Sequence, residues 1–342
     1  MYRFITEAEV PLYEAFIASH PRGHFLQTYA WACFKTKGNP NVLASFDENG
    51  KIRGGMSLFS AKAPILSTCT VYSPRGPVCD DDPEVIGELV SGAKEYARSV
   101  GAYQLTVDPD ARAEDAFVSA LQDAGFGLGD NVVDNAILQP LSVYRINLAG
   151  KGEEELLASY HSKTRYSVRA ALASNATWRI AGKEELPKFQ TLLEQTGAKD
   201  GFHVRPIQYL YEMCDALGPE RFLLFLVEVE GVAVAGSILL RVGEKTWHLL
   251  GGCSGEHKEV QPNYLMQWAM QTWSIEQGCT LYDMRGVAGE QDKTTPLEGL
   301  LRFKKRFGGE LVPLVGRMDL LLTPWKRTAI DFLRKVKHLV RK

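Results

Sequence analysis

The chain has 342 residues, of which 45% are hydrophobic and 23% charged, and its 39 lysines and arginines against 41 aspartates and glutamates give a formal net charge of −2. This length is about two domains' worth, because a single core seldom grows beyond about 250–300 residues. The composition excludes disorder, collagen-like repeats and a disulfide scaffold. Near neutrality argues against a polyanionic partner, but only if the charges are spread evenly along the chain.

The six cysteines are scattered, form no Cys-x-x-Cys pair and do not cluster with the seven histidines at metal-ligand spacing. We therefore expect reduced thiols and no metal site. The start of the chain is too acidic for a signal peptide. The most apolar stretch, residues 222–240, is interrupted by Glu228 and Glu230, so no membrane span is expected. These features predict a cytoplasmic protein that at most lies on a membrane surface.

The first strongly patterned elements form a β-hairpin, with strands over 41–46 and 52–59 and a turn at 47–50. A further short strand follows. A helix over 83–100 has apolar residues at three-and-four spacing, and the strand over 102–108 after it ends in a carboxylate.

The second half repeats this plan, with a hairpin over 222–229 and 232–240, a short strand, a helix over 263–277 and a strand over 279–283 that ends in a carboxylate. A glycine in the hairpin and the glycine before the last strand lie 46 positions apart in the first copy and 42 in the second. Antiparallel strands that precede a helix and a parallel return predict an α/β layered domain. This order resembles the N-acetyltransferase-like (GNAT) unit.

The predicted fold class is therefore α/β, with two tandem GNAT-like (acyl-CoA N-acyltransferase-like) domains. Glycines separate the strand over 143–148 from a helix that opens at Glu153. We place domain 1 at residues 1–149 and domain 2 at residues 150–316, and we expect residues 317–342 to pack back on domain 1.

The usual acyl donor of GNAT enzymes has little support in this sequence. Those enzymes hold the pyrophosphate of acetyl-CoA on a glycine-rich turn that opens a helix. Here the first helix follows Cys-Asp-Asp-Asp-Pro at 79–83, and the second follows Glu-Val-Gln-Pro-Asn at 259–263. Three aspartates would repel a pyrophosphate.

Five motifs occur in one order, at residues 25–35, 72–77, 108–109, 201–209 and 301–309. With them the chain resembles the FemABX family, the non-ribosomal peptidyltransferases that build peptidoglycan cross-bridges from aminoacyl-tRNA. The resemblance covers most of the chain. It is to the compact FemX type, because the coiled-coil arm of the larger members is missing.

The resemblance implies an aminoacyltransferase that moves an amino acid from aminoacyl-tRNA to the side-chain amine of the third stem-peptide residue of a peptidoglycan precursor. The acceptor is UDP-MurNAc-pentapeptide or lipid II, and no cofactor is expected. The acceptor's own amine attacks an activated ester, which fits the lack of a Gly-x-Ser-x-Gly elbow. The alternatives are an acyl-CoA-dependent GNAT N-acetyltransferase and a non-catalytic tRNA- or membrane-binding module.

Three residues match family positions at the diphosphate of the UDP-linked acceptor: Lys35, Arg205 and, one helical turn further, Tyr209. Arginine binds phosphate bidentately and lysine acts as a point charge. The alternatives are a solvated lysine and an arginine at a helix start. Arg75, in a Pro-Arg-Gly-Pro turn, either points into the cleft between the two copies or stabilises its turn.

Asp108 ends a strand, where α/β folds place working groups. In FemX-like enzymes the matching aspartate is a candidate base for the attacking amine, and the residue matching Tyr103 lines the acceptor site. Alternation puts Asp108 on the face of Gln104 and Thr106, opposite Tyr103. Both can face one cleft only if the strand twists or bulges. The alternative is that Asp-Pro simply ends the strand.

Lys304 follows Phe303 in a basic cluster at residues 302–306. In the family the matching lysine lies at the reacting ester, where a cation stabilises the developing oxyanion. The alternative is a solvated basic strand edge. After the second hairpin the family usually has Tyr-x-Tyr-Gly, whereas this chain has His248 and Leu250 in place of the tyrosines, so we expect altered acceptor recognition there.

The C-terminal stretch is basic and amphipathic, and its apolar residues fall roughly on one face: Trp325, Ala329, Leu333, Val336 and Val340. It suits contact with anionic lipid or tRNA phosphates, and the alternative is packing of this face on domain 1. Residues 293–342 hold 13 basic and 4 acidic residues, against 26 and 37 in residues 1–292. A polyanionic partner therefore fits the basic end.

Overall fold

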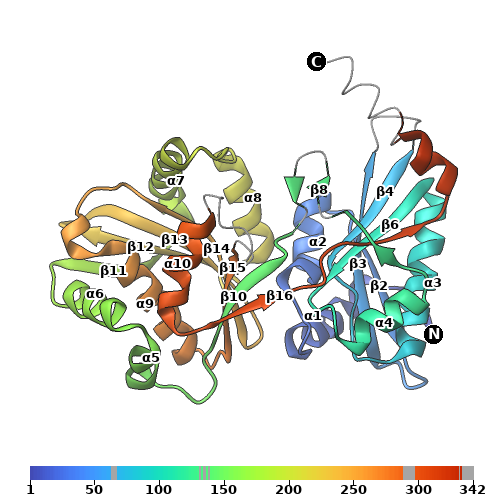
Figure 1. The fold of residues 1–342 in the computed structure, drawn as a ribbon, viewed down its shortest axis with the longest axis horizontal. Coiled ribbons are helices and arrows are strands. Elements are labelled where there is room, and N and C mark those ends of the chain that lie inside the picture. Colours follow the sequence, from blue (N-terminus) through green and yellow to red (C-terminus); the bar gives the residue numbers. More distant parts are fainter. Residues whose placement is uncertain are drawn as a thin grey trace. The chain divides into compact units, whose positions relative to one another are not determined.

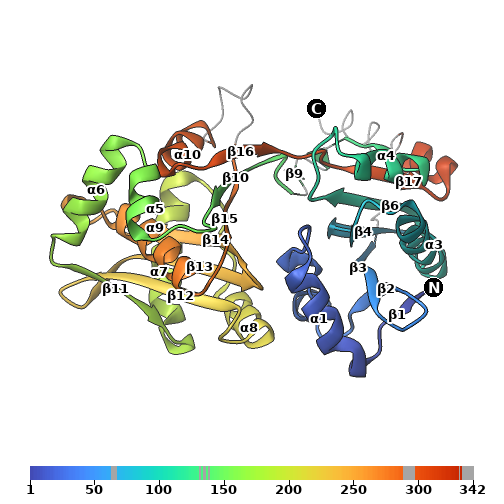
Figure 2. The same ribbon diagram turned by 90° about the horizontal axis from the view of Figure 1, so that it is seen from below.

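The computed structural model describes residues 1–62, 68–130, 132–133, 136–137, 139–287, 297–330 and 332. The chain divides into two compact units (Figures 1 and 2). Unit 1 comprises Met1–Leu141 and Leu314–Lys342, and unit 2 comprises Ser142–Pro313.

Unit 1 is a sheet with helices. Its strands are β1 (Tyr2–Phe4), β2 (Asn41–Phe46), β3 (Ile52–Lys62), β4 (Cys69–Arg75), β5 (Val78–Cys79), β6 (Ala102–Pro109), β7 (Gly127–Leu128) and β17 (Met318–Leu321), beside a small pair of β8 (Val132–Val133) and β9 (Ala136–Ile137). Its helices are η1 (Glu7–Glu9), α1 (Val10–Ser19), η2 (Phe25–Gln27), α2 (Tyr29–Thr36), α3 (Pro83–Ser99) and α4 (Ala116–Asp123). The sheet runs in the order β1-β2-β3-β4-β6-β17-β7, with β5 paired to β3.

The predicted plan of the first copy is confirmed. Strands β2 and β3 pair antiparallel, and β4 pairs parallel with β6 across helix α3. The α3 helix begins after Asp82, whose side chain accepts hydrogen bonds from the backbone N–H groups of Glu84 (2.9 Å) and Val85 (3.3 Å). Apolar residues at helical spacing, among them Leu89 and Ala93, bury one face of α3 in the core of unit 1.

Unit 2 has the same plan. Its strands are β10 (Ser142–Asn147), β11 (Ala176–Ala181), β12 (Phe222–Val229), β13 (Val232–Val242), β14 (Lys245–Cys253), β15 (Leu281–Gly286) and β16 (Glu310–Pro313). Its helices are α5 (Glu153–Ser159), α6 (Ser162–Leu172), η3 (Lys183–Glu185), α7 (Leu186–Asp200), α8 (Ile207–Leu217), η4 (Lys258–Val260), α9 (Pro262–Glu276), α10 (Leu297–Lys304) and η5 (Lys305–Phe307). The sheet order is β11-β12-β13-β14-β15-β10-β16, and α9 packs on it (Figure 1). Two α/β units with one strand plan confirm the predicted fold class.

The parallel pair of strands differs between the units. In unit 1, β4 and β6 stay paired from Cys69 opposite Ala102 to Arg75 opposite Pro109. In unit 2, β14 and β15 pair only as far as Trp247 opposite Asp283. The described residues of β14 from His248 onward and of β15 from Met284 onward therefore lie beyond the ladder that joins these strands. An opening in the sheet of unit 2 follows, and unit 1 has no equivalent at this pair.

The boundaries between the two units differ from the predicted ones by several residues. Strand β10 pairs with β15 and β16, so it belongs to unit 2, and the boundary falls after Leu141 rather than after residue 149. The glycines that suggested a linker lie in the turn between β10 and α5. At the other end, the backbone N–H of Leu314 bonds to the Leu141 carbonyl, so unit 1 resumes at residue 314 rather than 317. Strand β17 then pairs with β6 and β7.

The described residues contain neither a membrane-spanning helix nor a cluster of metal-ligating side chains. Helices in this part of the chain are too short or too polar to cross a membrane. In the same residues no group of three or more His, Cys, Asp or Glu side chains is arranged to hold a metal ion.

Candidate functional site

Lys304 is the last residue of α10 and lies at the opening in the sheet of unit 2. Its side chain is only 4% exposed, so the alternative of a solvated strand edge is wrong. The ammonium donates hydrogen bonds to the carbonyl oxygens of Met284, Gly286 (2.9 Å) and Arg285 (3.4 Å). These carbonyls belong to the part of β15 that β14 has left. Lys304 therefore occupies backbone acceptors that the parting of the strands makes available.

Burial also changes the acidity of Lys304. The low-dielectric surroundings lower the pKa of Lys304 from 10.5 to about 8; the Asp283 carboxylate opposes this shift and the Arg285 guanidinium adds to it. An ammonium with a pKa near neutrality serves as a fixed cation below pH 8 and can give up a proton above it.

His248 lies on β14 at the start of the same opening. Ser237 Oγ lies 2.8 Å from His248 Nε2 and also donates its only hydrogen to the Leu250 carbonyl (3.0 Å). Nε2–H must therefore be the donor to Ser237, and Nδ1 accepts from the Gln267 amide (3.3 Å). The Gln267 carbonyl oxygen in turn accepts from the Tyr282 hydroxyl (2.9 Å). The donor and the acceptor of each bond in this chain are therefore fixed, and they select the neutral tautomer of His248 that carries its hydrogen on Nε2.

Burial, with Lys304 and Arg285 nearby, lowers the pKa of His248 to about 3. The imidazole is thus neutral at physiological pH, and both ring nitrogens already bond to protein groups. These bonds link β14 to β13 and α9, and the predicted role of His248 in acceptor recognition stays a prediction.

Phe303 precedes Lys304 and packs in an aromatic cluster. Its ring centroid lies 5.1 Å from that of Phe307 and 5.5 Å from that of Tyr264 on α9. The cluster fixes the end of α10 on the body of unit 2, and it thereby positions the Lys304 ammonium.

Asp108 lies on β6 of unit 1 and is 2% exposed. Its Oδ2 accepts from the Tyr72 hydroxyl (2.7 Å), and its Oδ1 accepts from the backbone N–H of Arg75 (2.8 Å). Burial raises the pKa of Asp108, while the Arg75 guanidinium and these two hydrogen bonds act in the opposite direction. A buried carboxyl with a raised pKa is a suitable proton acceptor. Tyr72 was not predicted as a site residue, although it lies in one of the motifs.

Arg75 is buried on β4, with its backbone in the left-handed region (φ 55°). Its guanidinium donates to the backbone carbonyls of Pro140 (2.6 Å) and Asp108 (3.4 Å). Of the two predicted roles of Arg75, these contacts correspond to stabilisation of its own turn rather than to a side chain that points into a cleft. Arg75 acts on Asp108 through charge and its backbone N–H.

Tyr103 lies at an irregularity in β6. Cys69 pairs with Ala102, but the next residue, Thr70, pairs with Gln104, so Tyr103 is an extra residue in the ladder with β4. Such a bulge interrupts the alternation of side chains along the strand. By the alternation of side chains, Tyr103 and Asp108 can face the same side of the sheet only if this strand twists or bulges, and the bulge is present.

The predicted phosphate-binding residues lie in both units. Lys35 is exposed on α2 of unit 1, with its ammonium 5.5 Å from the centre of the Phe34 ring. In unit 2, Arg205 is exposed and its guanidinium carbon lies 5.6 Å from the centre of the half-buried Tyr209 ring. The structure therefore brings Arg205 and Tyr209 together, at the start of α8.

Known proteins are similar to this chain over most of its length. The model of the FemAB family matches residues 5–231 and 227–335. The chain belongs to the FemAB family. Curated relatives include the lipid II:glycine glycyltransferases of Staphylococcus epidermidis (27% identical) and Staphylococcus aureus (28% identical), each aligned over 91% of this chain and 91% of the relative. As a member of this family, the chain is a transferase, as predicted.

Solved structures agree with the family and the fold. A crystal structure of FemX superposes with a TM-score of 0.88 at 27% identity, covering 97% of this chain and 100% of that chain. A tandem GNAT protein from the clavulanic acid biosynthesis pathway has a TM-score of 0.56 at 12% identity, over 94% of this chain and 98% of that one, and supports the fold alone. The predicted resemblance to the FemABX family and its compact FemX type is confirmed.

Residues of this FemAB-family chain that sequence reasoning missed include the pair of Asp283 and Arg145. Asp283 lies within β15, at the last pair of its ladder with β14, and is buried; it accepts from Arg145 Nε (2.9 Å) and from the backbone N–H of Arg285 (2.6 Å). It is the second copy's counterpart of Asp108, so the repeat itself was a signal for it. Its ion pair with Arg145 makes it a structural carboxylate that fixes the strand beneath Lys304.

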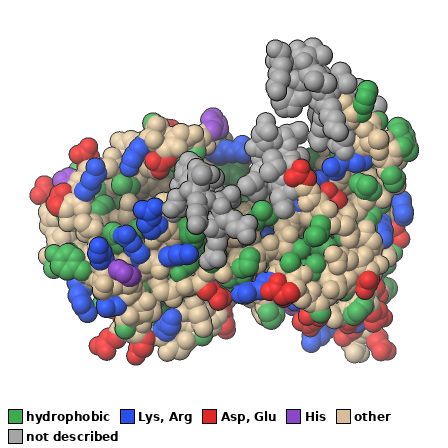
Figure 3. Space-filling view, in the orientation of Figure 1, with side chains coloured by type: hydrophobic (Ala, Val, Ile, Leu, Met, Phe, Trp, Pro, Cys, Tyr) green, Lys and Arg blue, Asp and Glu red, His purple; other side chains and the backbone are tan. Residues whose placement is uncertain are grey.

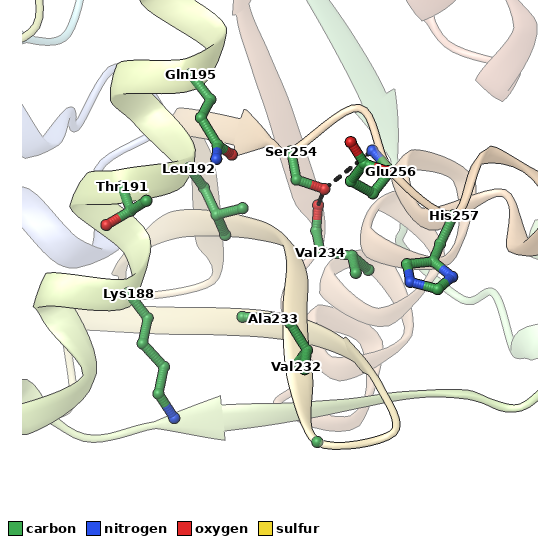
Figure 4. Close-up of a pocket in the computed structure, with 11 residues that line it drawn as sticks. Lys188, Thr191, Leu192, Gln195, Val232, Ala233, Val234, Ser254, Glu256 and His257 are labelled. Atoms are coloured by element: carbon green, nitrogen blue, oxygen red, sulfur yellow. Dashed lines mark hydrogen bonds between the residues drawn. The ribbon is translucent and has the colours of Figure 1, made fainter.

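A hollow of about 520 Å³ lies elsewhere in unit 2, between α7 and the turn from β12 to β13 (Figure 4). Its lining includes Lys188, Leu192, Val232 and His257. Ser254, at its wall, donates to the Val234 carbonyl (3.3 Å) and accepts from the Glu256 N–H (3.1 Å). The predicted site residues do not line this hollow, and Lys188 and His257 in its wall are paired with Glu185 and Glu259 outside it. The chemistry therefore points to the opening at Lys304 instead.

Proposed function

We propose that this FemAB-family transferase moves an amino acid from aminoacyl-tRNA to the side-chain amine of the third stem-peptide residue of a peptidoglycan precursor. The observation that carries the proposal is the buried Lys304 ammonium at the opening between β14 and β15. It is supported by family membership and by relatives that are named as lipid II:glycine glycyltransferases.

In the proposed reaction, Lys304 stabilises negative charge on oxygen and Asp108 takes up a proton. The acceptor amine attacks the ester carbonyl of the charged tRNA, and a tetrahedral oxyanion forms. Lys304 stabilises that oxyanion, and then the ribose oxygen that leaves as the ester C–O bond breaks. The amine loses one proton, for which Asp108 is the proposed acceptor, and the ribose oxygen gains one. The ester supplies the activation, so the reaction needs no cofactor.

On the acceptor side, Lys35, Arg205 and Tyr209 are the proposed diphosphate-binding residues. Both cations are exposed, as contact with a diphosphate requires. Since the named substrate of the curated relatives is lipid II, we propose the lipid-linked precursor as the acceptor, ahead of UDP-MurNAc-pentapeptide.

Two observations speak against acyl-CoA as the donor. In unit 1, the side chain of Asp82 already accepts hydrogen bonds from the first N–H groups of α3, where a pyrophosphate would have to bind. In unit 2, α9 begins at Pro262, which has no backbone N–H to offer. Tight binding of coenzyme A in calorimetry would reverse this conclusion.

The proposed acceptor can be tested directly. Purified protein would be incubated with a full set of charged tRNAs and either lipid II or UDP-MurNAc-pentapeptide, and the acceptor would be analysed by mass spectrometry. We expect the mass of one or more amino-acid residues on lipid II. If both precursors remain unmodified, the proposed function is wrong.

A lipid-linked acceptor suggests contact with the inner face of the membrane through the C-terminal segment. Trp325 is 64% exposed and Phe332 is 65% exposed. Seven residues apart, they fall on one face of a helix. The segment is held by Ile330, which is buried, and by Arg327, which donates to Gln104 Oε1 (2.7 Å). The predicted packing of the Trp325 face on domain 1 is therefore wrong for Trp325 itself; Leu333, Val336 and Val340 lie outside the described residues.

We predict that replacing both Trp325 and Phe332 by Ser lowers binding to anionic vesicles at least tenfold, because exposed aromatic rings and basic residues bind such surfaces together. Cosedimentation with vesicles of phosphatidylglycerol and phosphatidylcholine measures this. Leu12→Ser, at an exposed leucine of α1, is the matched control. Unchanged binding by the double variant would remove this segment from membrane contact.

A further inference from the structure

Two separate segments of unit 2 contain basic residues and no acidic ones. Residues 156–182 include Lys163, Arg165, Arg169 and Arg179 without any Asp or Glu, and residues 299–309 include Arg302, Lys304, Lys305 and Arg306, again without any Asp or Glu. In a chain with a net charge of −2, such segments stand out. Sequence reasoning noticed only the second of them.

The structure joins these two segments. The backbone N–H of His161, just before α6, bonds to the Arg306 carbonyl (2.9 Å). The rings of Tyr160 and Phe307 pack edge to face, with centroids 5.2 Å apart. Helix α6 therefore begins on η5, immediately after Lys304. Figure 3 shows lysine and arginine side chains gathered on the face of unit 2 that carries α6 and α10.

Helix α6 has a sharply divided surface. Thr164, Val168 and Ala171 are buried at three-and-four spacing. The opposite side presents Lys163, Tyr166 and Arg169, which together span about 120° around the helix with Tyr166 in the middle. Tyr166 is 76% exposed, the highest value among the large apolar and aromatic side chains of the described residues. An exposed aromatic ring between two cations has no use in the packing of unit 2.

The cations of this helix face are available to a ligand. Among the described residues, Lys163 and Arg169 take part in no ion pair. By contrast, Arg179 from the same acid-free segment is paired with Glu228 (2.7 Å) and Glu185 (3.3 Å). Ion pairs among the described residues thus leave the positive charges of Lys163 and Arg169 on α6 in place, whereas that of Arg179 on the neighbouring strand is neutralised.

We propose that the surface formed by Lys163, Tyr166 and Arg169 of α6 with Lys305 and Arg306 of η5 binds RNA, namely the acceptor end of the donor tRNA. This inference rests on the proposed function and adds the site of donor recognition. Lysine and arginine bind backbone phosphates without regard to sequence. The Tyr166 ring offers a stacking platform for an unpaired base, as single-stranded ends require.

The position of this surface fits its proposed ligand. Residues 163–169 span about 9 Å along the helix, roughly the rise of two to three nucleotides in one strand of a duplex. Lys305 and Arg306 directly follow Lys304. An RNA end held on this surface is therefore close in the chain to the ammonium that is proposed to act on its ester.

The test uses the full chain and uncharged tRNA, with fluorescence anisotropy across a salt series. We expect Lys163→Glu with Arg169→Glu to weaken binding at least tenfold at 100 mM salt, and to reduce the slope of log affinity against log salt by about two. Tyr166→Ala should weaken binding of an RNA hairpin with a single-stranded 3′ end about tenfold, and that of a blunt hairpin by less than twofold.

The matched control is Lys51→Glu with Lys199→Glu, which makes the same change in net charge at exposed lysines of the β2–β3 turn and of α7. If the Glu variant does not fold, Lys163→Gln with Arg169→Gln removes the same contacts without reversing the charge. In transfer assays the α6 variants should raise KM for charged tRNA and leave kcat unchanged.

The outcomes separate this inference from the proposed function. Transfer by the native chain with an unchanged KM in the α6 variants overturns the RNA surface and leaves the function intact. If the α6 variants weaken RNA binding but the native chain shows no transfer, the RNA-binding surface is supported and the proposed aminoacyl transfer is wrong. Loss of binding to anionic vesicles, with tRNA binding retained, would make the surface a lipid site and so overturn the proposal.

Discussion

Lys304→Met is expected to reduce the rate of aminoacyl transfer by a factor of about 100 to 1,000, the usual effect of removing a donor that stabilises an oxyanion. Methionine has nearly the length of lysine and fits a largely buried site, but it carries no charge. Binding of the acceptor should persist, because Lys304 is proposed to act at the ester. Single-turnover rates with charged tRNA, combined with acceptor titrations, measure the two effects separately.

The control for this variant is Lys199→Met, which removes an exposed ammonium of the same unit. It should leave rate and binding unchanged. If Lys304→Met loses acceptor binding to the same extent as rate, the lysine has no role in the chemistry. Loss of secondary structure would instead mean that the carbonyls of Met284 and Gly286 need the ammonium for folding, and Lys304→Arg would then test whether charge alone restores the rate.

The pKa of Lys304 gives this role a dependence on pH. With the pKa lowered to about 8, the ammonium is present below pH 8, and we expect the transfer rate to fall about tenfold per pH unit well above it. The stability contribution has the opposite sign. Between pH 8 and about 10.5 the unfolded chain binds more protons at this lysine than the folded chain does, so the folded state gains stability as pH rises. Rate and melting temperature should therefore diverge. A rate that does not fall between pH 7 and 9.5 would contradict a protonated Lys304.

The repeated plan was visible in the sequence because its signals are local. Hairpin turns, apolar spacing in α3 and α9, and carboxylates at strand ends all act within short windows. The boundary was misplaced for the same reason. The glycines at 150 and 152 mark a turn, whereas the membership of β10 depends on its pairing with β15, more than 130 residues away. Pairing between distant strands leaves no mark in a local pattern.

For the candidate site too, some features could be predicted from the sequence and others could not. The resemblance to the FemABX family singled out Lys304 and Asp108 as candidates, one in a basic cluster and the other at a strand end. Their environments could not be predicted. The pKa of Lys304 depends on its burial against β15, and the neutral state of His248 depends on burial with Lys304 and Arg285 nearby. Ser237 and Gln267, from other elements of unit 2, select the tautomer of His248. The basic face of α6 was not predicted either, although its segment lacks acidic residues, because only the packing of α6 on η5 places it next to Lys304.

Asp108→Asn is expected to slow transfer by a factor of about 100, within the range for loss of a general base. The amide keeps the shape of the carboxyl group. Its oxygen can still accept from the Arg75 N–H, and its NH2 group can donate to the Tyr72 hydroxyl, so the fold should persist. Initial rates at pH 7.5 and thermal melts measure the two properties.

The matched control is Asp319→Asn. Asp319 on β17 is another largely buried carboxylate of unit 1, which accepts from Thr106 (2.7 Å) and from Arg317 (2.8 Å). Because its partner Arg317 would lose its counter-charge, we expect lower stability with a normal rate per folded molecule. Equal rates for Asp108→Asn and the native chain would exclude Asp108 as the base.

Tyr72→Phe separates a base from a structural carboxylate. The Tyr72 hydroxyl donates to Asp108 and so stabilises its charged form; its loss should raise the pKa of Asp108 further. Proton transfer to Asp108 requires the carboxylate, so the acid limb of the rate profile should move to higher pH, while the plateau stays near the native value. A purely structural Asp108 would lower the rate equally at every pH. The direction of that one shift therefore decides whether the aspartate at the end of β6 takes the proton of the attacking amine.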